Sequence, residues 1–309
     1  MVLLIKASRD PAENWIEAIA ADLPDLEMRV WPDVGIRDEV EFMIANQLPP
    51  GEFASFPNLK FVASTSAGVD RLLNDPDFPA HIPIVRSINT QRTATMCAWV
   101  CYQVIGHHRR FANYRENQPN KIWEFMHYPP PDELGIGVMG LGTLGGMAAR
   151  TLRGFMYDVA GWSRSFKTID GIKCFAGSDQ LEAFLKRSNI IVSILPGTEG
   201  TNNLLNRETL DLLPEGAYIV NCGRGNLIHD DDLIDAMDSG HIAGAALDVF
   251  KTEPLPEDHP FWSHPKITIT PHYSSNGSAK HGVGVIIKNI RRARAGVPFE
   301  DVIDKELGY

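Results

Sequence analysis

One stretch of the sequence decides the fold: Ile136-Gly-Val-Met-Gly-Leu-Gly-Thr-Leu-Gly145. Its first residues are apolar and predict a buried strand, and the residues after the last glycine predict a helix. In such a strand–turn–helix unit, Gly140 permits the tight turn, Gly142 lets the backbone approach a pyrophosphate, and Gly145 lets helix and strand pack closely. The N–H groups at the start of the helix would then face the phosphates. The stretch predicts a dinucleotide-binding domain, although a glycine-rich surface turn can carry the same letters.

Strands and helices alternate on both sides of this motif. Short runs rich in Val, Ile and Phe predict strands at Val2–Ala7, Met28–Trp31, Phe42–Ala45, Phe61–Ser64, Ile82–Val85, Ile136–Gly140, Asp158–Trp162, Ile190–Leu195, Tyr218–Asn221, Ala243–Val249 and Lys266–Thr270. Helices are predicted at Pro11–Ala21, Thr90–Tyr114, Gly145–Gly154, Gln180–Lys186, Asn206–Leu212, Asp230–Ser239 and Asn276–Arg294. Such alternation implies parallel strands joined by crossover helices.

The alternation restarts after the break at Pro129-Pro-Pro131, which indicates two domains. We expect an α/β protein with two Rossmann-like, doubly wound domains, one flavodoxin-like and one dinucleotide-binding, with a cleft between them. The tail after residue 297 is too short to form a domain, so we expect the chain to return to its first domain. The expected division is a discontinuous substrate-binding domain of residues 1–100 plus 276–309 and a dinucleotide-binding domain of residues 101–275.

Composition and charge exclude several classes of protein. The 309 residues are 44% hydrophobic and 22% charged, which is typical of soluble globular chains. A formal net charge of -10 argues against nucleic acid or anionic membrane as a partner, because both reward clustered Lys and Arg. The first residues lack the features of a signal peptide, and no apolar run approaches the ~20 residues of a membrane span. The spacings of the four cysteines do not suit zinc, and we expect no metal site. We expect the cysteines to be reduced thiols, as in a cytoplasmic protein.

The end of the second strand of a dinucleotide-binding domain usually decides between the two nicotinamide cofactors. An acidic side chain there would bind the ribose hydroxyls and repel a 2′-phosphate. This chain has no acid at that point, and it offers Ser163, Arg164 and Ser165 instead. A planar guanidinium suits a phosphate, and the hydroxyls add donors. The segment therefore favours NADPH, with NADH as the alternative cofactor, whereas without the glycine motif it would be an ordinary polar turn.

Three polar residues follow predicted strands in the second half of the chain. Arg224 follows the strand at 218–221, Glu253 follows the strand at 243–249, and His272 follows the strand at 266–270. In an open parallel sheet, ligands bind beyond the carboxyl ends of the strands, so these side chains can converge on one site. Each of them alone is more often a solvated surface residue or a helix cap. Their joint placement after three strands favours a catalytic site.

At this point the chain resembles the D-isomer-specific 2-hydroxyacid dehydrogenase family, and within it the glyoxylate/hydroxypyruvate reductase A type. The matching segments cover most of the second half in the order of the family: Gly137–Arg150, Gly161–Ser165, Leu195–Gly200, Gly216–Gly225, Asp230–Phe250, Glu253–Pro256 and Thr270–His272. In the first half, Ser66–Asp70 resembles the substrate loop of the family. The resemblance implies hydride transfer from the nicotinamide to the carbonyl carbon of a small 2-oxo acid.

The resemblance also implies a role for each catalytic residue. His272, as imidazolium, would donate a proton to the developing alkoxide, and Glu253 would orient the ring and favour its charged form. Arg224 would bind the substrate carboxylate and polarise the carbonyl. Backbone N–H groups around Ala67, Gly68 and Val69 would help to bind the carboxylate. The cofactor-binding residues implied are Gly140, Gly142, Thr143, Leu144, Gly145, Ser163, Arg164, Ser165, Leu195, Pro196, Cys222, Asp248, which would contact the nicotinamide carboxamide, and His272.

Some positions depart from the family pattern. Met96–Val100 lacks the acidic residue common in this helix, Tyr273–Asn276 replaces small residues, and Asn46 or Gln47 stands where the type often has Trp. A more polar pocket would suit hydroxypyruvate over large apolar oxo acids.

Two other functions stay open on the sequence alone. One is another D-2-hydroxyacid dehydrogenase, of the phosphoglycerate, lactate or formate type. The other is a nicotinamide-sensing binding protein that resembles the corepressors with this fold. The family resemblance further implies a homodimer, with apolar residues near Ala98–Ile105 at the interface or, equally, in the core.

Overall fold

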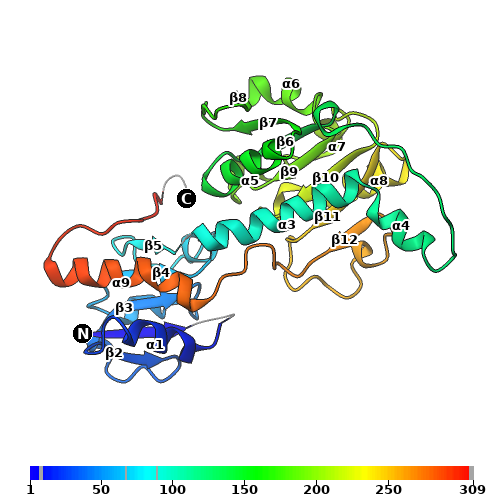
Figure 1. Ribbon diagram of the computed structural model, residues 1–309. Helices are drawn as coiled ribbons and strands as arrows, with labels where there is room; N and C mark the ends of the chain where they lie inside the picture. The colour runs from blue at the N-terminus through cyan, green and yellow to red at the C-terminus, as the bar shows by residue number, and fades with distance from the viewer. Residues whose placement is uncertain (7–9, 67, 88–89, 306–309) are drawn as a thin grey trace. The chain divides into compact units, whose positions relative to one another are not determined.

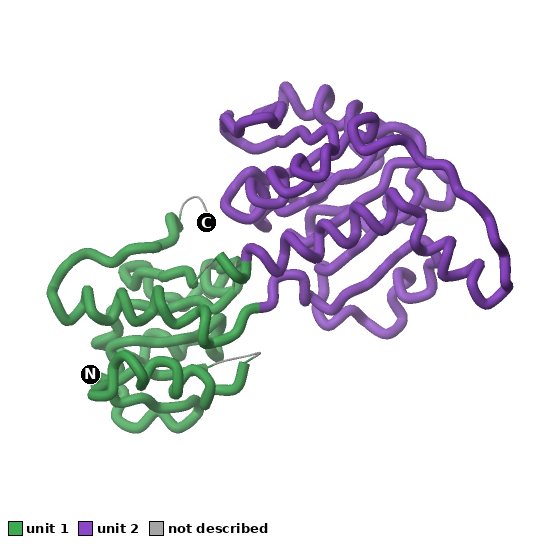
Figure 2. The backbone as a smooth tube through the Cα atoms, in the orientation of Figure 1, with its two compact units in different colours: residues 1–92, 277–309 green, residues 93–276 purple. Residues whose placement is uncertain are grey.

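The computed structural model describes residues 1–6, 10–66, 68–87 and 90–305. The chain divides into two compact units, which are distinguished by colour in Figure 2. Unit 1 comprises Met1–Arg92 and Gly277–Tyr309, and unit 2 comprises Thr93–Asn276. The boundary expected at residue 100 lies inside helix α3 (Thr90–His108), near whose start the two units divide. The assignment of one domain to the substrate and the other to the cofactor stays a prediction.

Unit 1 is built on a parallel sheet of five strands in the order β2-β1-β3-β4-β5, the doubly wound order of flavodoxin-like domains. The strands are β1 Val2–Lys6, β2 Glu27–Val30, β3 Val40–Ala45, β4 Phe61–Ser64 and β5 Ile84–Arg86. The central strands are apolar on both faces because helices or loops cover both sides. Helix α1 (Ala12–Ala20) and helix α9 (Ala279–Ala295) share one of these two apolar cores.

The stretch from Gly277 onward belongs to unit 1. Helix α9 contributes Val283, Ile286 and Ile290 to the core that it shares with β1, β3 and β4 (Figure 1). Beyond the helix, Val302 forms an antiparallel bridge with Val85 of β5. The return of the chain therefore adds both a helix and a strand-like edge to the first domain.

Unit 2 is built on a parallel sheet of seven strands in the order β12-β11-β10-β9-β6-β7-β8. The strands are β6 Gly135–Met139, β7 Asp158–Ser163, β8 Lys173–Ala176, β9 Ile190–Ser193, β10 Ala217–Asn221, β11 Ile242–Leu247 and β12 Ile267–Ile269. The order reverses between β6 and β9, which is the topological switch of a dinucleotide-binding domain. The predicted α/β class with two Rossmann-like domains is confirmed.

The helices of unit 2 lie on both faces of this sheet (Figure 1). They are α3, α4 Phe111–Asn117, α5 Thr143–Gly154, α6 Leu181–Leu185, α7 Arg207–Leu210 and α8 Asp230–Asp238. None of the helices within the described part of the chain combines the length and the low polarity needed to cross a membrane.

Three details of the predicted elements were wrong. The helical stretch expected from Thr90 to Tyr114 is two helices, because α3 ends at His108 and Arg110 adopts a left-handed conformation with φ of 59°. At this end of α3 the ring of His108 is held by two contacts. Tyr157 Oη lies 2.8 Å from its Nδ1, and the carbonyl oxygen of Pro129 lies 2.8 Å from its Nε2. Strand β8 was missed because Lys173–Ala176 forms a short edge strand with one buried side chain and little apolar pattern. The short helix α2 (Asp70–Leu73) was missed as well.

Helix α3 is fastened to unit 2 along one face. Met96, Val100 and Val104 lie in the apolar core that α3 shares with β6, β9 and β10. One turn further, the ring of His107 stacks on Tyr218, with centroids 3.9 Å apart and planes inclined by 14°. Burial, together with the smaller effects of the charges of Arg110 and His108, lowers the pKa of His107 from 6.5 to about 4. The folded protein therefore holds this ring neutral where the unfolded chain would already be protonated.

This difference predicts a loss of stability in mild acid. Below pH 6.5 the unfolded chain takes up a proton that the folded state refuses until about pH 4, so unfolding becomes progressively easier across that window. We expect the free energy of unfolding to fall by up to about 3 kcal/mol on this account. The measurement is urea unfolding of the wild type and of His107→Phe, which keeps the stacked ring, at several pH values between 7 and 4. An identical pH dependence in both proteins would contradict the prediction.

Candidate active site

The glycine-rich turn joins β6 to α5 in the manner that the sequence predicts. Gly140 has φ of +99°, a conformation that favours glycine, and its N–H donates to the carbonyl of Trp162 at 2.8 Å. A Cβ at Gly145 would lie 1.7 Å from the carbonyl oxygen of Gly140, so this position requires glycine for helix and strand to meet. A Cβ at Gly142 would meet nothing within 4 Å. The turn thus leaves space where a pyrophosphate is expected.

The start of α5 faces the same space. Thr143 is its first residue and Leu144 the second, and the N-cap residue, Gly142, has no side chain to accept from the first-turn N–H groups. An anion is the natural partner of such a helix end. The residues present therefore fit the pyrophosphate of a dinucleotide.

The end of β7 carries the three residues expected to choose the cofactor. Ser163 is buried and its hydroxyl donates to the carbonyl of Ser165 at 2.8 Å, which shapes the turn after the strand. Arg164 and Ser165 are exposed. The exposed side chain of Phe166 follows directly. The turn thus presents a guanidinium and a hydroxyl at the surface, with no carboxylate between residues 163 and 169.

Further cofactor residues were predicted at the ends of β9 and β10. Leu195 and Cys222 are buried side chains of the two apolar cores of unit 2, so a contact with a cofactor would have to come from their main chain. Pro196 follows Leu195 and is partly exposed. Burial raises the pKa of the Cys222 thiol, and the nearby charge of Asp248 raises it further, so this thiol stays neutral.

Arg224 stands in a turn that is shaped by the last residue of β10. Asn221 is buried; its amide donates to the carbonyl of Arg224 at 2.9 Å, and its Oδ1 accepts from the N–H of Gly223 at 3.2 Å. One guanidinium nitrogen of Arg224 donates to the carbonyl of Gly223 at 2.7 Å. The part played by Asn221 was not predicted, although an Asn before a glycine turn is itself a signal of such side-chain bonding.

The turn of Arg224 touches the loop that carries Glu253. A Cβ at Gly225 would lie 1.9 Å from the carbonyl carbon of Phe250 and 2.3 Å from the nitrogen of Lys251. Only glycine allows the two backbones to approach so closely. The segment after β10 and the segment after β11 are therefore held in one arrangement.

Glu253 and His272 form the central pair of the site. One carboxylate oxygen of Glu253 lies 2.8 Å from Nδ1 of His272, and the other accepts from the N–H of Phe250 at 3.2 Å. Both side chains are partly buried, with 22% and 34% exposed. The carboxylate thus fixes the orientation of the ring, with Nε2 on the side away from Glu253.

Asp248 braces the turn that carries His272. His272 has φ of 52°, which is uncommon for a residue with a side chain. The carboxylate of Asp248 is fully buried and accepts from the hydroxyl of Thr270 at 2.5 Å, from the N–H of Tyr273 at 2.7 Å and from the N–H of Ser274 at 2.9 Å. These bonds on both sides of His272 hold it in place. Asp248 was predicted to contact the cofactor, and this bracing role was not predicted.

The catalytic residues predicted from the sequence thus lie on neighbouring parts of unit 2. Arg224 follows β10, Glu253 follows β11 and His272 follows β12, and these strands are adjacent and parallel in the sheet. Of the predicted substrate loop, Ala67 lies outside the described residues, while Gly68 and the buried Val69 belong to unit 1. The described residues contain no group of three His, Cys, Asp or Glu placed to hold a metal ion.

The two candidates for the pocket position differ in their surroundings. Asn46 donates to the hydroxyl of Thr65 at 2.9 Å, and it accepts from the N–H of Thr65 at 3.0 Å and from the hydroxyl of Ser64 at 3.1 Å. This amide therefore shapes the backbone before the predicted substrate loop. Gln47 lies 3.5 Å from Arg71 at the surface.

A doubly wound sheet, a glycine turn at its first crossover and a carboxylate–imidazole pair beyond its strands define a nicotinamide-dependent dehydrogenase. The model for the NAD-binding domain of the D-isomer specific 2-hydroxyacid dehydrogenases matches residues 101–274. The chain belongs to that family.

Known relatives extend over the whole chain. The glyoxylate/hydroxypyruvate reductases A of Serratia proteamaculans and Yersinia enterocolitica are each 35% identical over 303 residues, which is 96% of both chains. A D-isomer specific 2-hydroxyacid dehydrogenase of Xanthobacter autotrophicus, solved with NADPH and MES, is 37% identical with a TM-score of 0.95 and covers 100% of this chain and 99% of its own. The NADPH-dependent glyoxylate/hydroxypyruvate reductase of Sinorhizobium meliloti, solved with NADP and sulfate, is 31% identical with a TM-score of 0.93 and the same coverage.

The glycine turn yields a prediction that separates stability from binding. Gly145→Ala should lower the free energy of unfolding by about 1–3 kcal/mol, because its methyl group would overlap the carbonyl oxygen of Gly140. Gly142→Ala should fold with stability within about 1 kcal/mol of the wild type but bind NADPH weakly, because it fills the space beside the pyrophosphate. Urea unfolding and fluorescence titration with NADPH measure the two effects. Equal stability losses in both variants would show that this account of the turn is wrong.

Proposed function

We propose that this chain reduces small 2-oxo acids, such as glyoxylate and hydroxypyruvate, to D-2-hydroxy acids with NADPH. The observation that carries the proposal is the 2.8 Å contact between the carboxylate of Glu253 and Nδ1 of His272 beyond adjacent parallel strands. The family of the chain and the activity named for its relatives support the same reaction. NADPH, when bound, supplies the hydride to the carbonyl carbon. The groups of the chain bind the substrate and supply the proton.

His272 is the proton donor of this proposal. As the carbonyl is reduced, negative charge develops on its oxygen, and a positioned imidazolium neutralises that charge by giving up a proton. The contact at Nδ1 with Glu253 leaves Nε2 as the ring nitrogen that transfers the proton. The carboxylate of Glu253 orients the ring for this transfer, and the bond from Phe250 N–H keeps the carboxylate itself in place.

Arg224 is the substrate-binding residue of this proposal. A guanidinium offers parallel N–H donors that match a planar carboxylate, and next to a carbonyl it withdraws electron density from the oxygen. The turn held by Asn221 supports this role, because it fixes the backbone from which the side chain extends.

The chain is suited to NADPH at the end of β7. Ser163 shapes the turn, and Arg164 and Ser165 would bind the 2′-phosphate with a cation and a hydroxyl. The pyrophosphate would lie on Gly140–Gly145, at the start of α5, and the carboxamide near Asp248. Solved relatives contain NADPH or NADP, which agrees with this choice.

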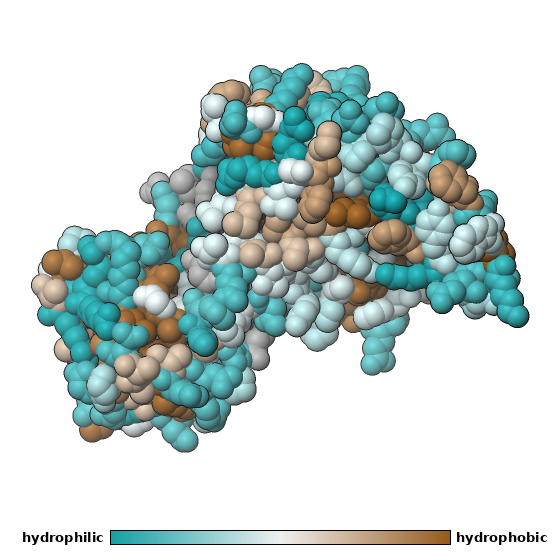
Figure 3. All heavy atoms as spheres, viewed as in Figure 1, coloured by the Kyte–Doolittle hydropathy of each residue, from teal (hydrophilic) through white to brown (hydrophobic). Residues whose placement is uncertain are grey.

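We further propose that the protein is a cytosolic homodimer. Of the stretch Ala98–Ile105, the side chains of Val100, Cys101 and Val104 are buried in the core of unit 2, so core packing explains them. Tyr102 of this stretch is exposed, as are Phe111, Ile122, Trp123 and Phe125 along the segment that follows. Apolar surface of this kind is typical of a subunit interface. Figure 3 shows hydrophobic residues, in brown, among the hydrophilic ones on the face in view. The four cysteines are free thiols, the state that a reducing cytosol maintains.

The test of the proposed function is a steady-state panel. Glyoxylate, hydroxypyruvate, pyruvate and phenylpyruvate are each paired with NADPH and NADH, and we expect the smaller polar acids with NADPH to give the highest kcat/KM. His272→Gln should lower kcat by ~10²–10⁴-fold while it still binds NADPH, because it lacks the proton donor. His264→Gln, a histidine before β12 that faces the exposed Asp238, is the matched control and should keep the wild-type rate. A protein that binds NADPH but turns over no oxo acid would instead support a sensor.

The cofactor choice is tested with Arg164→Ala. Loss of a charge-assisted bond of about 1.5–3 kcal/mol should lower kcat/KM for NADPH by roughly ten- to a hundredfold. The value for NADH, which has no 2′-phosphate, should stay unchanged and is the internal control. Equal efficiency of the wild type with both cofactors would sink this part of the proposal.

A further inference from the structure

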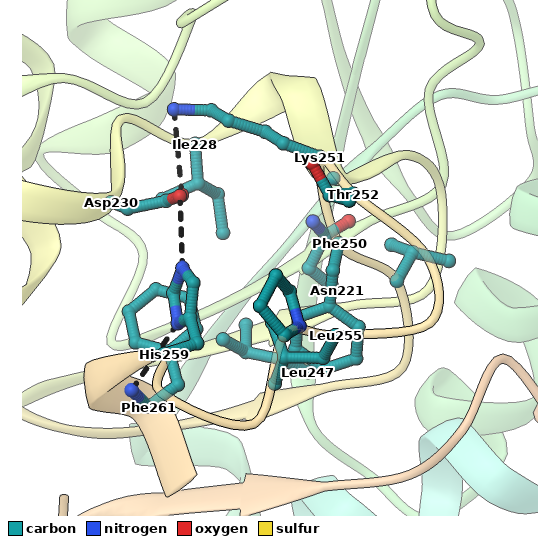
Figure 4. Close-up of a pocket in the computed structure, with 13 residues that line it drawn as sticks. Asn221, Ile228, Asp230, Leu247, Phe250, Lys251, Thr252, Leu255, His259 and Phe261 are labelled. Carbon is teal, nitrogen blue, oxygen red and sulfur yellow. Dashed lines mark hydrogen bonds and ion pairs between the residues drawn. The ribbon is translucent and has the colours of Figure 1, made fainter.

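A second charged cluster lies behind the loops of the active site. The segment after β10 continues through a 3-10 helix at Gly225–Leu227 into α8, whose first residue is Asp230. The segment after β11 carries Lys251 and Glu253 and continues to His259. Side chains of the two segments enclose a cavity of about 180 Å³, which Figure 4 shows.

Asp230 connects these two segments. One of its carboxylate oxygens lies 3.5 Å from Nζ of Lys251, and the other lies 3.6 Å from Nε2 of His259. Figure 4 shows the carboxylate between the ends of the two basic side chains. His259 is itself oriented, because its Nδ1 accepts from the N–H of Phe261 at 3.3 Å. A single carboxylate on α8 thus contacts the loop of Glu253 at both of its ends.

We propose that Asp230 is a positioning residue, which holds the loop of residues 250–259 through Lys251 and His259 and thereby sets the contact between Glu253 and His272. This inference rests on the proposed function. The N–H of Phe250 donates to the carboxylate of Glu253, and Phe250 is the neighbour of Lys251 in the chain. The contact between Asp230 and Lys251 therefore lies one residue from the N–H group that holds Glu253. Asp230 contacts Lys251 and His259, which lie outside the glycine turn, so it acts on Glu253 through the loop.

The arrangement favours this role over simple stabilisation of the helix. Asp230, Asp231 and Asp232 all lie in the first turn of α8, where each carboxylate interacts favourably with the helix dipole. Asp230 differs from the exposed Asp231 in that it faces the Glu253 loop. Asp231→Asn therefore removes the same charge from the same helix turn without affecting the loop, and it is the matched control for Asp230→Asn.

The first measurement is kinetic. We expect Asp230→Asn to lower kcat for glyoxylate or hydroxypyruvate by about tenfold, because a small displacement of a catalytic group is costly, and to leave KM for NADPH unchanged. Asp231→Asn should keep the wild-type kcat. In a Glu253→Gln background, Asp230→Asn should lower kcat no further, because the group through which it acts is already gone. An equal loss in both backgrounds would overturn the proposal.

The second measurement does not depend on turnover. Amide hydrogen exchange of residues 249–259 should be faster in Asp230→Asn than in the wild type, while exchange of residues 140–146 should be the same in both proteins. In Asp231→Asn, exchange of residues 249–259 should equal that of the wild type. Lys251→Met removes one of the two partners of Asp230 and leaves α8 intact, so it should show the same effect in weaker form. It replaces Asp230→Asn in this measurement if that variant does not fold. Unchanged exchange in the loop would refute the anchor. If exchange of the loop is faster in Asp230→Asn but the wild type reduces no oxo acid, the proposed function is refuted and the anchor is not.

Discussion

The close approach of two backbones at Gly225 is the constraint on which the rest of the site depends. The carbonyl carbon of Phe250 stands where any other residue would place its Cβ, so the turn after β10 and the loop after β11 touch without side chains between them. That contact brings the segment of Arg224 and the segment of Glu253 to one place. Because β10, β11 and β12 are parallel neighbours, the third segment, which carries His272, begins at the same edge of the sheet. The order of the strands in the sheet thus brings the three catalytic segments together.

Buried polar groups complete this arrangement. Asp248 is inaccessible to solvent, and a carboxylate without water is costly unless donors surround it. Its three donors come from the residues on either side of His272, so the same bonds that satisfy the carboxylate hold the histidine in a left-handed conformation. Asn221 does the same for the turn of Arg224. Both residues act through the backbone, which explains how short loops can hold catalytic groups with little freedom.

Much of this could be predicted from the sequence, for physical reasons that differ between elements. The strands of unit 2 were found within a few residues because buried parallel strands are continuous apolar runs, and Gly140, Gly142 and Gly145 have a fixed relation to the turn. Strand β8 lacks such a run, and the end of α3 depends on contacts with Tyr157 and Pro129, far along the chain. The bracing by Asp248 and the contact at Gly225 were missed because they depend on how neighbouring strands are aligned, which no local pattern records.

Because unit 1 is made of two separate parts of the chain, it cannot fold completely during synthesis. Its core needs Val283, Ile286 and Ile290 of α9, and its last strand pairs with Val302, so this unit cannot complete its packing while the chain is still emerging from the ribosome. Unit 2 is encoded without interruption from Thr93 to Asn276 and has all its strands available earlier. Unit 2 is therefore positioned to fold during synthesis, whereas residues 1–92 of unit 1 complete their core only after α9 has been made.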